Sequence, residues 1–137
     1  MLRAFDGHTS YLRLNSNPLC ENPSRGETSA GSQQGDFAIS HHSDAGAVTV
    51  LLHDGDPGLQ VEKAGRWHDV SVKRGSLVIN LGDVMQVWSN DRYRAPVHRV
   101  LASRDRVRIS ARFFLNPSYA TNYAPLPPLG PGEEPRY

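Results

Sequence analysis

The stretch Val48-Thr49-Val50-Leu51-Leu52 decides the fold class of this chain. Its residues are β-branched or aliphatic at every position, which is typical of a β-strand covered on both faces. The run Leu77-Val78-Ile79 has the same character. Short runs of this kind, separated by Gly, Pro, Asp and Asn, recur from about residue 37 to residue 115, whereas helical periodicity is almost absent. The pattern predicts an all-β domain.

Eight short strands are expected along the chain. They cover residues 12–15, 37–42, 48–53, 59–62, 67–70, 77–81, 98–101 and 106–115. Eight strands favour a double-stranded β-helix, or jelly roll, with two facing antiparallel sheets and few or no helices. Asp83 and the pair Asn90-Asp91 are interpreted as turn residues, because Asn and Asp readily satisfy backbone groups in tight turns.

The 137 residues are expected to form one domain. Residues 1–123 would be the jelly roll, with a long, mobile, turn-rich loop over 18–35 bordering a substrate entrance. Residues 124–137 are rich in proline and predict an extended tail. No secretory signal and no membrane span are recognised in the sequence.

The charge balance argues against nucleic-acid and membrane partners, and the cysteine content argues against an intramolecular disulfide. The 15 basic and 14 acidic residues create no strong field toward nucleic acid or a membrane, so a small-molecule partner is expected. Cys20 is the single cysteine of the sequence and cannot form an intramolecular disulfide. The chain therefore suits a reducing cytoplasm.

Two imidazoles and one carboxylate form the candidate metal site. His42 and Asp44 are two residues apart, so in a β-strand both side chains would lie on one face. His98 would supply the third ligand. Two His and one carboxylate on one side of a metal leave the opposite positions open, as in the facial triad of non-haem Fe(II) oxygenases. A His-x-Asp pair alone is more often ordinary surface chemistry, so its role depends on the surrounding sequence.

The last predicted strand separates a polar face from an apolar one. Arg108, Ser110 and Arg112 alternate with Ile109, Ala111 and Phe113. The first set would face a polar pocket and the second set would pack away from it. The sequence offers no amphipathic helix to cover the apolar faces of these strands. The cover would come from a subunit partner, a swapped segment or a portion of a longer protein.

Further blocks follow these residues in a fixed order. They are Gly58-Leu59-Gln60-Val61, Gly65-Arg66-Trp67, Val78-Ile79-Asn80-Leu81-Gly82-Asp83, Trp88-Ser89-Asn90-Asp91-Arg92-Tyr93, Val97-His98-Arg99-Val100 and Arg108-Ile109-Ser110-Ala111-Arg112-Phe113-Phe114-Leu115-Asn116-Pro117. Together with the stretch from His42 to Leu52, they resemble the isopenicillin N synthase-like branch of the Fe(II)/2-oxoglutarate-dependent oxygenases. The resemblance runs from about residue 12 to residue 119.

The resemblance implies a role for six residues. It makes His42, Asp44 and His98 the catalytic iron ligands, and Arg108 and Ser110 the anchor for the distal carboxylate of 2-oxoglutarate. A guanidinium offers two parallel donors that match a carboxylate, which agrees with this role.

Asn15 would be a further cosubstrate residue, as the first position of the family's Asn-x-Tyr motif. With Fe(II), 2-oxoglutarate and O2, such enzymes oxidise a small organic molecule and release succinate and CO2. The outcome is a hydroxylation, a desaturation or a cyclisation.

Two departures from the family pattern keep other functions open. Asn17 stands where the motif has tyrosine, and family members are commonly about twice this length, with an N-terminal helical half over the larger sheet. One alternative is a truncated or non-catalytic metal-binding jelly roll that acts as a subunit or needs a partner chain. Another is an enzyme that uses the same iron site without 2-oxoglutarate.

Several other polar residues have two interpretations. Asn80, Gln86 and Trp88 could line a pocket, although core packing and turn hydrogen bonds explain them equally well. Alternation should point His41 away from the metal. The remaining histidines, His8, His53 and His68, are expected to be exposed or locally hydrogen-bonded.

Overall fold

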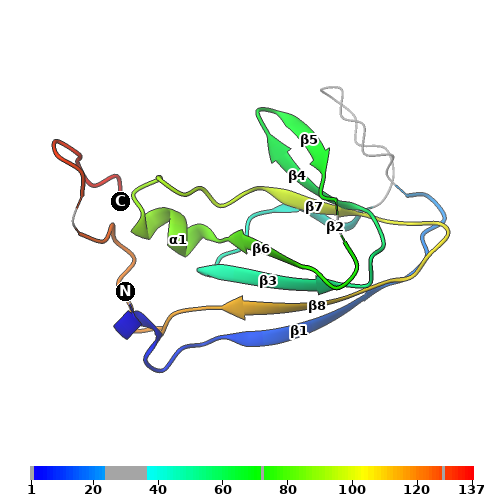
Figure 1. The fold of residues 1–137 in the computed structure, drawn as a ribbon, viewed down its shortest axis with the longest axis horizontal. Helices are drawn as coiled ribbons and strands as arrows, with labels where there is room; N and C mark the ends of the chain where they lie inside the picture. The colour runs from blue at the N-terminus through cyan, green and yellow to red at the C-terminus, as the bar shows by residue number, and fades with distance from the viewer. Residues whose placement is uncertain (1, 24–36, 72, 128) are drawn as a thin grey trace.

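The computed structural model describes residues 2–23, 37–71, 73–127 and 129–137 (Figure 1). The elements are η1 (Leu2–Phe5), β1 (Tyr11–Asn17), β2 (Phe37–His42), β3 (Val48–His53), β4 (Leu59–Lys63), β5 (Arg66–Asp69), β6 (Leu77–Leu81), α1 (Asp83–Trp88), β7 (His98–Leu101) and β8 (Arg108–Leu115). Each of the eight predicted strands has its counterpart, and the ends differ by at most two residues. No helix of the described part is long and apolar enough to span a membrane.

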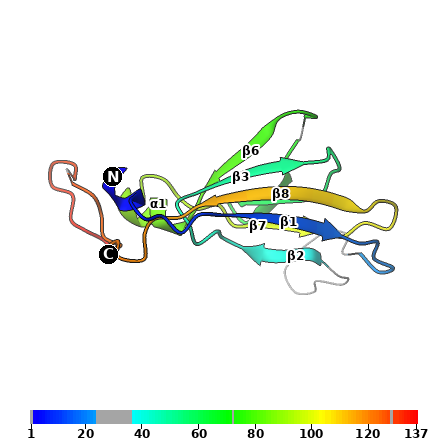
Figure 2. The ribbon, with the colours of Figure 1, turned by 90° about the horizontal axis from the view of Figure 1, so that it is seen from below.

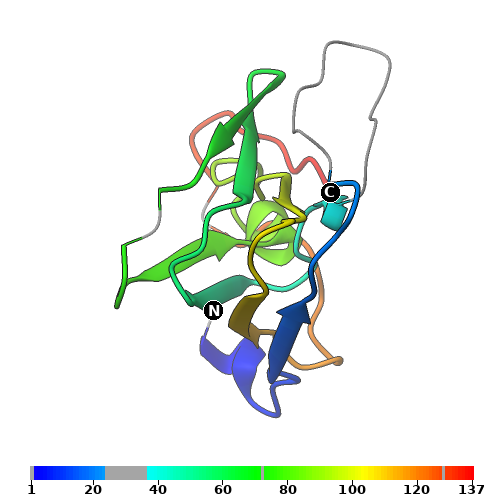
Figure 3. The same cartoon turned by 90° about the vertical axis from the view of Figure 1, so that its right-hand side faces the viewer.

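The strands form two four-stranded sheets with antiparallel pairing. The first sheet has the order β1-β8-β3-β6 and the second the order β2-β7-β4-β5. Figure 2 shows β6, β3, β8 and β1 following one another across the view. Figure 3, from the right-hand end of Figure 1, shows the β4–β5 hairpin projecting from the rest. This is the predicted jelly roll.

The short helix α1 corrects the expected turn at Asp83. Asp83 is the first helical residue, and Gly82 is the N-cap. Val84 and Trp88, one helical turn apart, are buried against Ala47, and the ring of Phe5 meets Trp88 edge to face at 5.8 Å between centroids. A six-residue helix is too short for a visible period in the sequence, and tertiary burial of these side chains stabilises it. The expected turn at Asn90-Asp91 is present, and both residues have positive φ angles.

The outer face of the first sheet is apolar and exposed. Seven of its side chains are between 40% and 75% exposed: Leu12, Leu14, Leu52, Leu77, Ile79, Ile109 and Phe113. The register places Ile79 opposite Val50, and Val50 opposite Phe113, so these positions form one continuous surface across neighbouring strands. The apolar outer face predicted from the sequence is therefore present in the structure and faces solvent.

The structure describes most of the predicted C-terminal tail but only the first residues of the predicted loop over 18–35. Residues 24–35 of the expected loop lie outside the described residues. Just before them, Leu19 forms an isolated parallel bridge with Ser103. The C-terminal segment, over the described residues 120–127 and 129–137, contains neither helix nor strand. It returns to the body, where the Leu126 amide donates to the Trp88 carbonyl at 2.9 Å.

Candidate metal centre

His42, Asp44 and His98 converge at the adjoining ends of β2 and β7. His42 is the last residue of β2 and pairs across the sheet with His98, the first residue of β7. The Nε2 atoms of His42 and His98 lie 3.7 and 3.8 Å from Asp44 Oδ1. The three ligand atoms all lie within 4.8 Å of one another. Asp44 lies in the loop beyond the end of β2, so this loop brings it to the imidazoles, whereas the sequence analysis used strand alternation to place it there.

Backbone carbonyls orient both imidazole rings. His42 Nδ1 lies 2.8 Å from the Ser40 carbonyl oxygen, and His98 Nδ1 lies 3.1 Å from that of Pro96. An Nδ1–H that donates to a carbonyl leaves the Nε2 lone pair of a neutral ring free. Both Nε2 lone pairs are then available on the side of Asp44. Metal-binding histidines commonly donate their other ring N–H to a backbone carbonyl in this way.

The Asp44 carboxylate has one oxygen tied back and one facing the rings. Its Oδ2 accepts hydrogen bonds from Thr49 Oγ1 at 2.6 Å and Asn80 Nδ2 at 2.8 Å. Burial raises the pKa of Asp44, but these two hydrogen bonds and the nearby imidazoles outweigh it and hold the pKa below its usual value. Burial also lowers the pKa of His98, against the opposing effects of the Pro96 carbonyl and Asp44. An ionised carboxylate beside a neutral imidazole is the protonation state that a divalent metal requires.

The junction of β6 and α1 holds the Asp44 backbone in place. The Asp83 amide donates to the Asp44 carbonyl at 2.8 Å, and the Gly82 amide donates to the Ala47 carbonyl at 2.9 Å. A Cβ at Gly82 would lie 2.1 Å from the Gly46 carbonyl oxygen and 2.6 Å from that of Asp44. Only glycine allows the two backbones to approach so closely.

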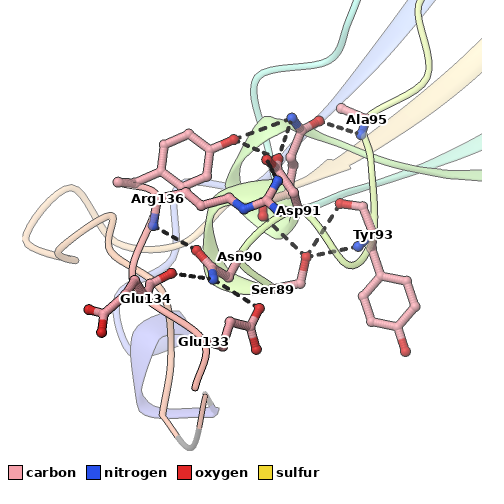
Figure 4. Close-up of polar contacts among 10 residues, drawn as sticks. Ser89, Asn90, Asp91, Tyr93, Ala95, Glu133, Glu134 and Arg136 are labelled. Atoms are coloured by element: carbon pink, nitrogen blue, oxygen red, sulfur yellow. Dashed lines mark hydrogen bonds and ion pairs between the residues drawn. The ribbon is translucent and has the colours of Figure 1, made fainter. Parts of the chain in front are cut away.

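A polar network holds the segment that leads into His98 (Figure 4). Asn90, which is 2% exposed, donates to Glu133 Oε1 at 2.9 Å and to the Glu134 carbonyl at 3.0 Å, and accepts from the Arg136 amide at 2.8 Å. We call the contacts of residues 133–137 with residues 86–95 the C-terminal clasp. It fixes the turn after α1 against the end of the described chain.

Gln86 connects the C-terminal clasp to the approach of β7. Its amide nitrogen donates to Asp91 Oδ1 at 2.9 Å, and its oxygen accepts from the Ala95 amide at 2.8 Å. Asp91 also accepts from Tyr137 Oη at 2.7 Å. Of the residues with two interpretations, Gln86 therefore forms turn hydrogen bonds and Trp88 packs in the core, whereas Asn80 lines a cavity beside the triad.

Arg108 and Ser110 lie on the inward face of β8. They are 4% and 3% exposed, and Arg108 Nη1 lies 3.4 Å from Ser110 Oγ. The register places them opposite Asn17 and Asn15 of β1. Burial lowers the pKa of Arg108, partly offset by Asp54 and Asp56. No salt bridge joins Arg108 to a carboxylate of the described residues, and its Nε and the Oδ1 atoms of both asparagines are buried without partners.

His53 is a buried neighbour of this group that the sequence did not single out. It is opposite Ser110 across the β3–β8 pair, and its Nδ1 accepts from the Gly55 amide at 2.9 Å. The expected local hydrogen bond is present, but the ring is buried rather than exposed. Alternation from Thr49 along β3 would have indicated this inward position. His8, His41 and His68 are exposed.

Cavities flank the triad on two sides. A cavity of about 200 Å³ reaches Asp44, Asn80 and His98 and is otherwise lined mainly by aliphatic side chains. A second cavity, of about 390 Å³, reaches His42, Asp44 and Asn15. Arg112, which the sequence placed on the polar face, lines both cavities. The triad is thus accessible from an apolar side and from a polar, basic side.

Comparison with known proteins assigns the family. A profile described as the 2OG-Fe(II) oxygenase superfamily matches residues 8–117. The chain belongs to this superfamily. The superfamily predicted from the sequence is confirmed, and its fold and donor set agree with the site described above.

Relatives of this 2OG-Fe(II) oxygenase chain are longer proteins. The chain is 38% identical over 119 residues to gibberellin 2-beta-dioxygenase 5 of Oryza sativa subsp. japonica, covering 85% of this chain and 32% of that protein. It is 40% identical over 132 residues to feruloyl CoA ortho-hydroxylase 2 of Arabidopsis thaliana, covering 94% and 34%. The chain therefore spans about a third of the length of these curated relatives.

Solved structures show the same relation. JOX2 in complex with 2OG, Fe and JA superimposes with a TM-score of 0.76 at 35% identity, over 90% of this chain and 34% of that one. The dioxygenase for auxin oxidation in rice gives a TM-score of 0.67 at 32% identity, over 85% and 37%. The jelly roll is thus the part of these longer proteins that this chain matches.

Proposed function

We propose that this chain forms the catalytic jelly roll of a non-haem Fe(II)- and 2-oxoglutarate-dependent oxygenase that oxidises a small organic molecule. The observation that carries the proposal is the convergence of two imidazole Nε2 atoms on Asp44 Oδ1, while Oδ2 is occupied by Thr49 and Asn80. Two nitrogen donors and one oxygen donor on one side fit Fe(II) and leave positions for cosubstrate and O2.

The proposed roles follow the chemistry of the side chains. His42, Asp44 and His98 would hold the iron. Arg108 and Ser110 would bind the distal carboxylate of 2-oxoglutarate. The bound iron and cosubstrate would supply oxidising power, with release of succinate and CO2.

Buried partnerless atoms support the cosubstrate site. The Arg108 Nε and the Asn15 Oδ1 lie inward without a hydrogen-bond partner. Unpaired buried polar atoms are costly, and a carboxylate would pair with the Arg108 guanidinium. Asn15 would line the same site from β1, opposite Ser110.

The aliphatic cavity gives the site a dry side. Leu51, Leu59, Val61, Val70 and Val78 line it beside His98. Such a wall excludes water from one side of the metal and strengthens the electrostatic interactions there. The Asp44 carboxylate would then remain directed at the metal by Thr49 and Asn80.

Three finer assignments complete the proposal. The ordered sequence blocks favour the isopenicillin N synthase-like branch. The single cysteine favours a cytoplasmic location. The exposed outer face of the first sheet favours a cover, supplied by a further segment N-terminal to the jelly roll or by a second copy of the chain.

Two observations favour a second candidate, a metal-binding jelly roll without catalysis. The outer face is uncovered among the described residues, and Asn17 stands where the family motif has tyrosine. In that case the domain would act as a subunit. An oxygenase that uses the same site without 2-oxoglutarate is a third candidate.

The test is anaerobic addition of Fe(II) and 2-oxoglutarate to the folded protein. A weak visible charge-transfer band is expected, and His98→Ala should abolish it, whereas the exposed His68→Ala should keep it. A well-folded protein without the band would contradict 2-oxoglutarate chelation. A band without succinate release in the presence of O2 and candidate substrates would favour the non-catalytic subunit.

A further inference from the structure

Arg112 is a buried cation beside the candidate iron site, and it has no hydrogen-bond or ion-pair partner among the described residues. It is 8% exposed and lies on the inward face of β8, two residues from Ser110. It lines both cavities that reach Asp44. Within the described part of the chain, no hydrogen bond or salt bridge joins its guanidinium to another side chain.

Its surroundings make a charged guanidinium unfavourable at this position. Burial lowers the pKa of Arg112, and the charges of Arg108 and Arg13 act in the same direction, with only Asp44 opposing them. A buried guanidinium without a counterion costs free energy, and a strongly perturbed ionisable group that lines a cavity is a candidate functional group. The guanidinium therefore indicates an anion site in the cavities.

The formal charges of the site with Fe(II) and 2-oxoglutarate bound do not cancel, and one positive charge is left over. Fe(II), the Asp44 carboxylate and the guanidinium groups of Arg108 and Arg112 together carry three net positive charges. The dianion of 2-oxoglutarate neutralises two of them. Among these groups one positive charge remains, and a singly charged carboxylate would neutralise it with geometry that suits a guanidinium.

The larger cavity offers room and a second cation for that anion. Its volume is about 390 Å³, and Arg13 lines it together with Arg112, His42 and Asp44. Arg13 is directly opposite Arg112 in the β1–β8 pair. Tyr11 and Phe114, stacked at 4.9 Å between ring centroids, add an apolar wall. A basic end and an aromatic wall fit an organic acid.

We propose that Arg112 binds a carboxylate of the organic substrate, which makes this chain an oxygenase for small carboxylic acids. The inference rests on the proposed function for its metal and cosubstrate. The other carboxylate that could reach Arg112 is the proximal one of 2-oxoglutarate, and the experiment separates the two.

The experiment measures binding by calorimetry under anaerobic conditions in the full chain loaded with Co(II). The probes are 2-oxoglutarate and, in its presence, the pair phenylacetate and phenylacetamide, which differ in the carboxylate. The natural protein should bind phenylacetate more tightly than the amide. Arg112→Leu should weaken phenylacetate binding by about 10- to 100-fold, as expected for charge-assisted hydrogen bonds, and should leave 2-oxoglutarate binding within about twofold.

Three variants guard the interpretation. Arg66→Leu removes an exposed charge of β5 outside both cavities and should behave as the natural protein. Arg112→Lys keeps the charge without the parallel donors and should give an intermediate loss. Without ligands, Arg112→Leu should unfold at a temperature no lower than the natural protein, because an unpaired buried charge is removed. A purely structural arginine would instead lower that temperature.

Three results would overturn the proposal. Weaker 2-oxoglutarate binding in Arg112→Leu would assign the guanidinium to the cosubstrate's proximal carboxylate. If the natural protein does not bind phenylacetate more tightly than phenylacetamide, Arg112 does not bind a substrate carboxylate. The same follows if Arg112→Leu retains that difference in affinity. Failure of the natural protein to bind 2-oxoglutarate would contradict the proposed function alone, because the phenylacetate comparison is then made on the Co(II) protein without cosubstrate.

Discussion

The two faces of β8 reverse the usual arrangement of a sheet. Arg108, Ser110 and Arg112 point inward and are buried, while Ile109 and Phe113 point outward and are exposed. Water-soluble sheets normally bury the apolar set. The reversal shows that the two faces of β8 have different surroundings. The inward face keeps buried polar groups beside the candidate site, and the outward face is an apolar surface exposed to solvent.

The largest expected effect is on the inward side, at the ligand that both imidazoles face. Asp44→Ala should abolish Fe(II) or Co(II) binding, because it removes the only anionic ligand atom of the triad. Metal content after dialysis, measured by atomic emission, checks this. His68→Ala, an exposed histidine of β5, serves as the control. Retained stoichiometric metal in Asp44→Ala would show that the site lies elsewhere.

The next effect concerns the residues that orient Asp44. Asn80→Ala should weaken metal binding by about 10- to 100-fold, the usual loss for an outer partner of a ligand, because Asp44 Oδ2 loses a 2.8 Å hydrogen bond. Competition with a chelating dye gives the affinity. Thr49→Val should behave similarly, since it removes the other donor to Oδ2. Unchanged metal affinities in both variants would mean that metal binding does not depend on the hydrogen bonds to Asp44 Oδ2.

The outward face should respond in the opposite way. Ile109→Lys and Ile79→Lys should leave metal affinity within about twofold and change stability by no more than about 0.5 kcal/mol, as expected at exposed positions. Self-association should fall, because charge interrupts the apolar surface. Light scattering and metal titration measure the two properties. A large loss of stability in dilute solution would show that this face is already buried.

The smallest effect lies in the C-terminal clasp, away from both faces. Hydrogen bonds from the Gly130 amide, Asn90 and Arg92 lower the pKa of Glu133 to about 2. A folded pKa below the ordinary value of 4.5 means that the clasp is most stable above pH 4.5. Its contribution is lost as the pH falls toward 2.

The Gly130 amide shift in an NMR titration reports this change. It should titrate near pH 2 in the natural protein and not at all in Glu133→Gln. A midpoint near the ordinary value of a glutamate would mean that the clasp is open in solution. Because the clasp lies away from both faces of the first sheet, this titration should leave metal affinity and self-association unchanged.

Strand positions could be predicted from the sequence because the period-two pattern is local. The pattern of β8 is the clearest case, since alternation alone separated Arg112 from Phe113. Helix α1 could not be predicted, because its burial depends on Phe5 and Ala47, far away in the chain. Strand alternation was expected to bring Asp44 to the side of His42, yet Asp44 lies in the loop after β2, where its carbonyl accepts from the Asp83 amide.

The sequence by itself determined the fold class, the family and the residue types of the candidate site, because these depend on side-chain chemistry and local periodicity. Only the tertiary structure decided which atoms meet. It aimed one oxygen of Asp44 at two imidazoles, buried His53 opposite Ser110 and left Arg112 without an ion-pair partner among the described residues. These results depend on contacts between strands distant in sequence, and the energy of a buried charge is set by neighbours that only folding brings together.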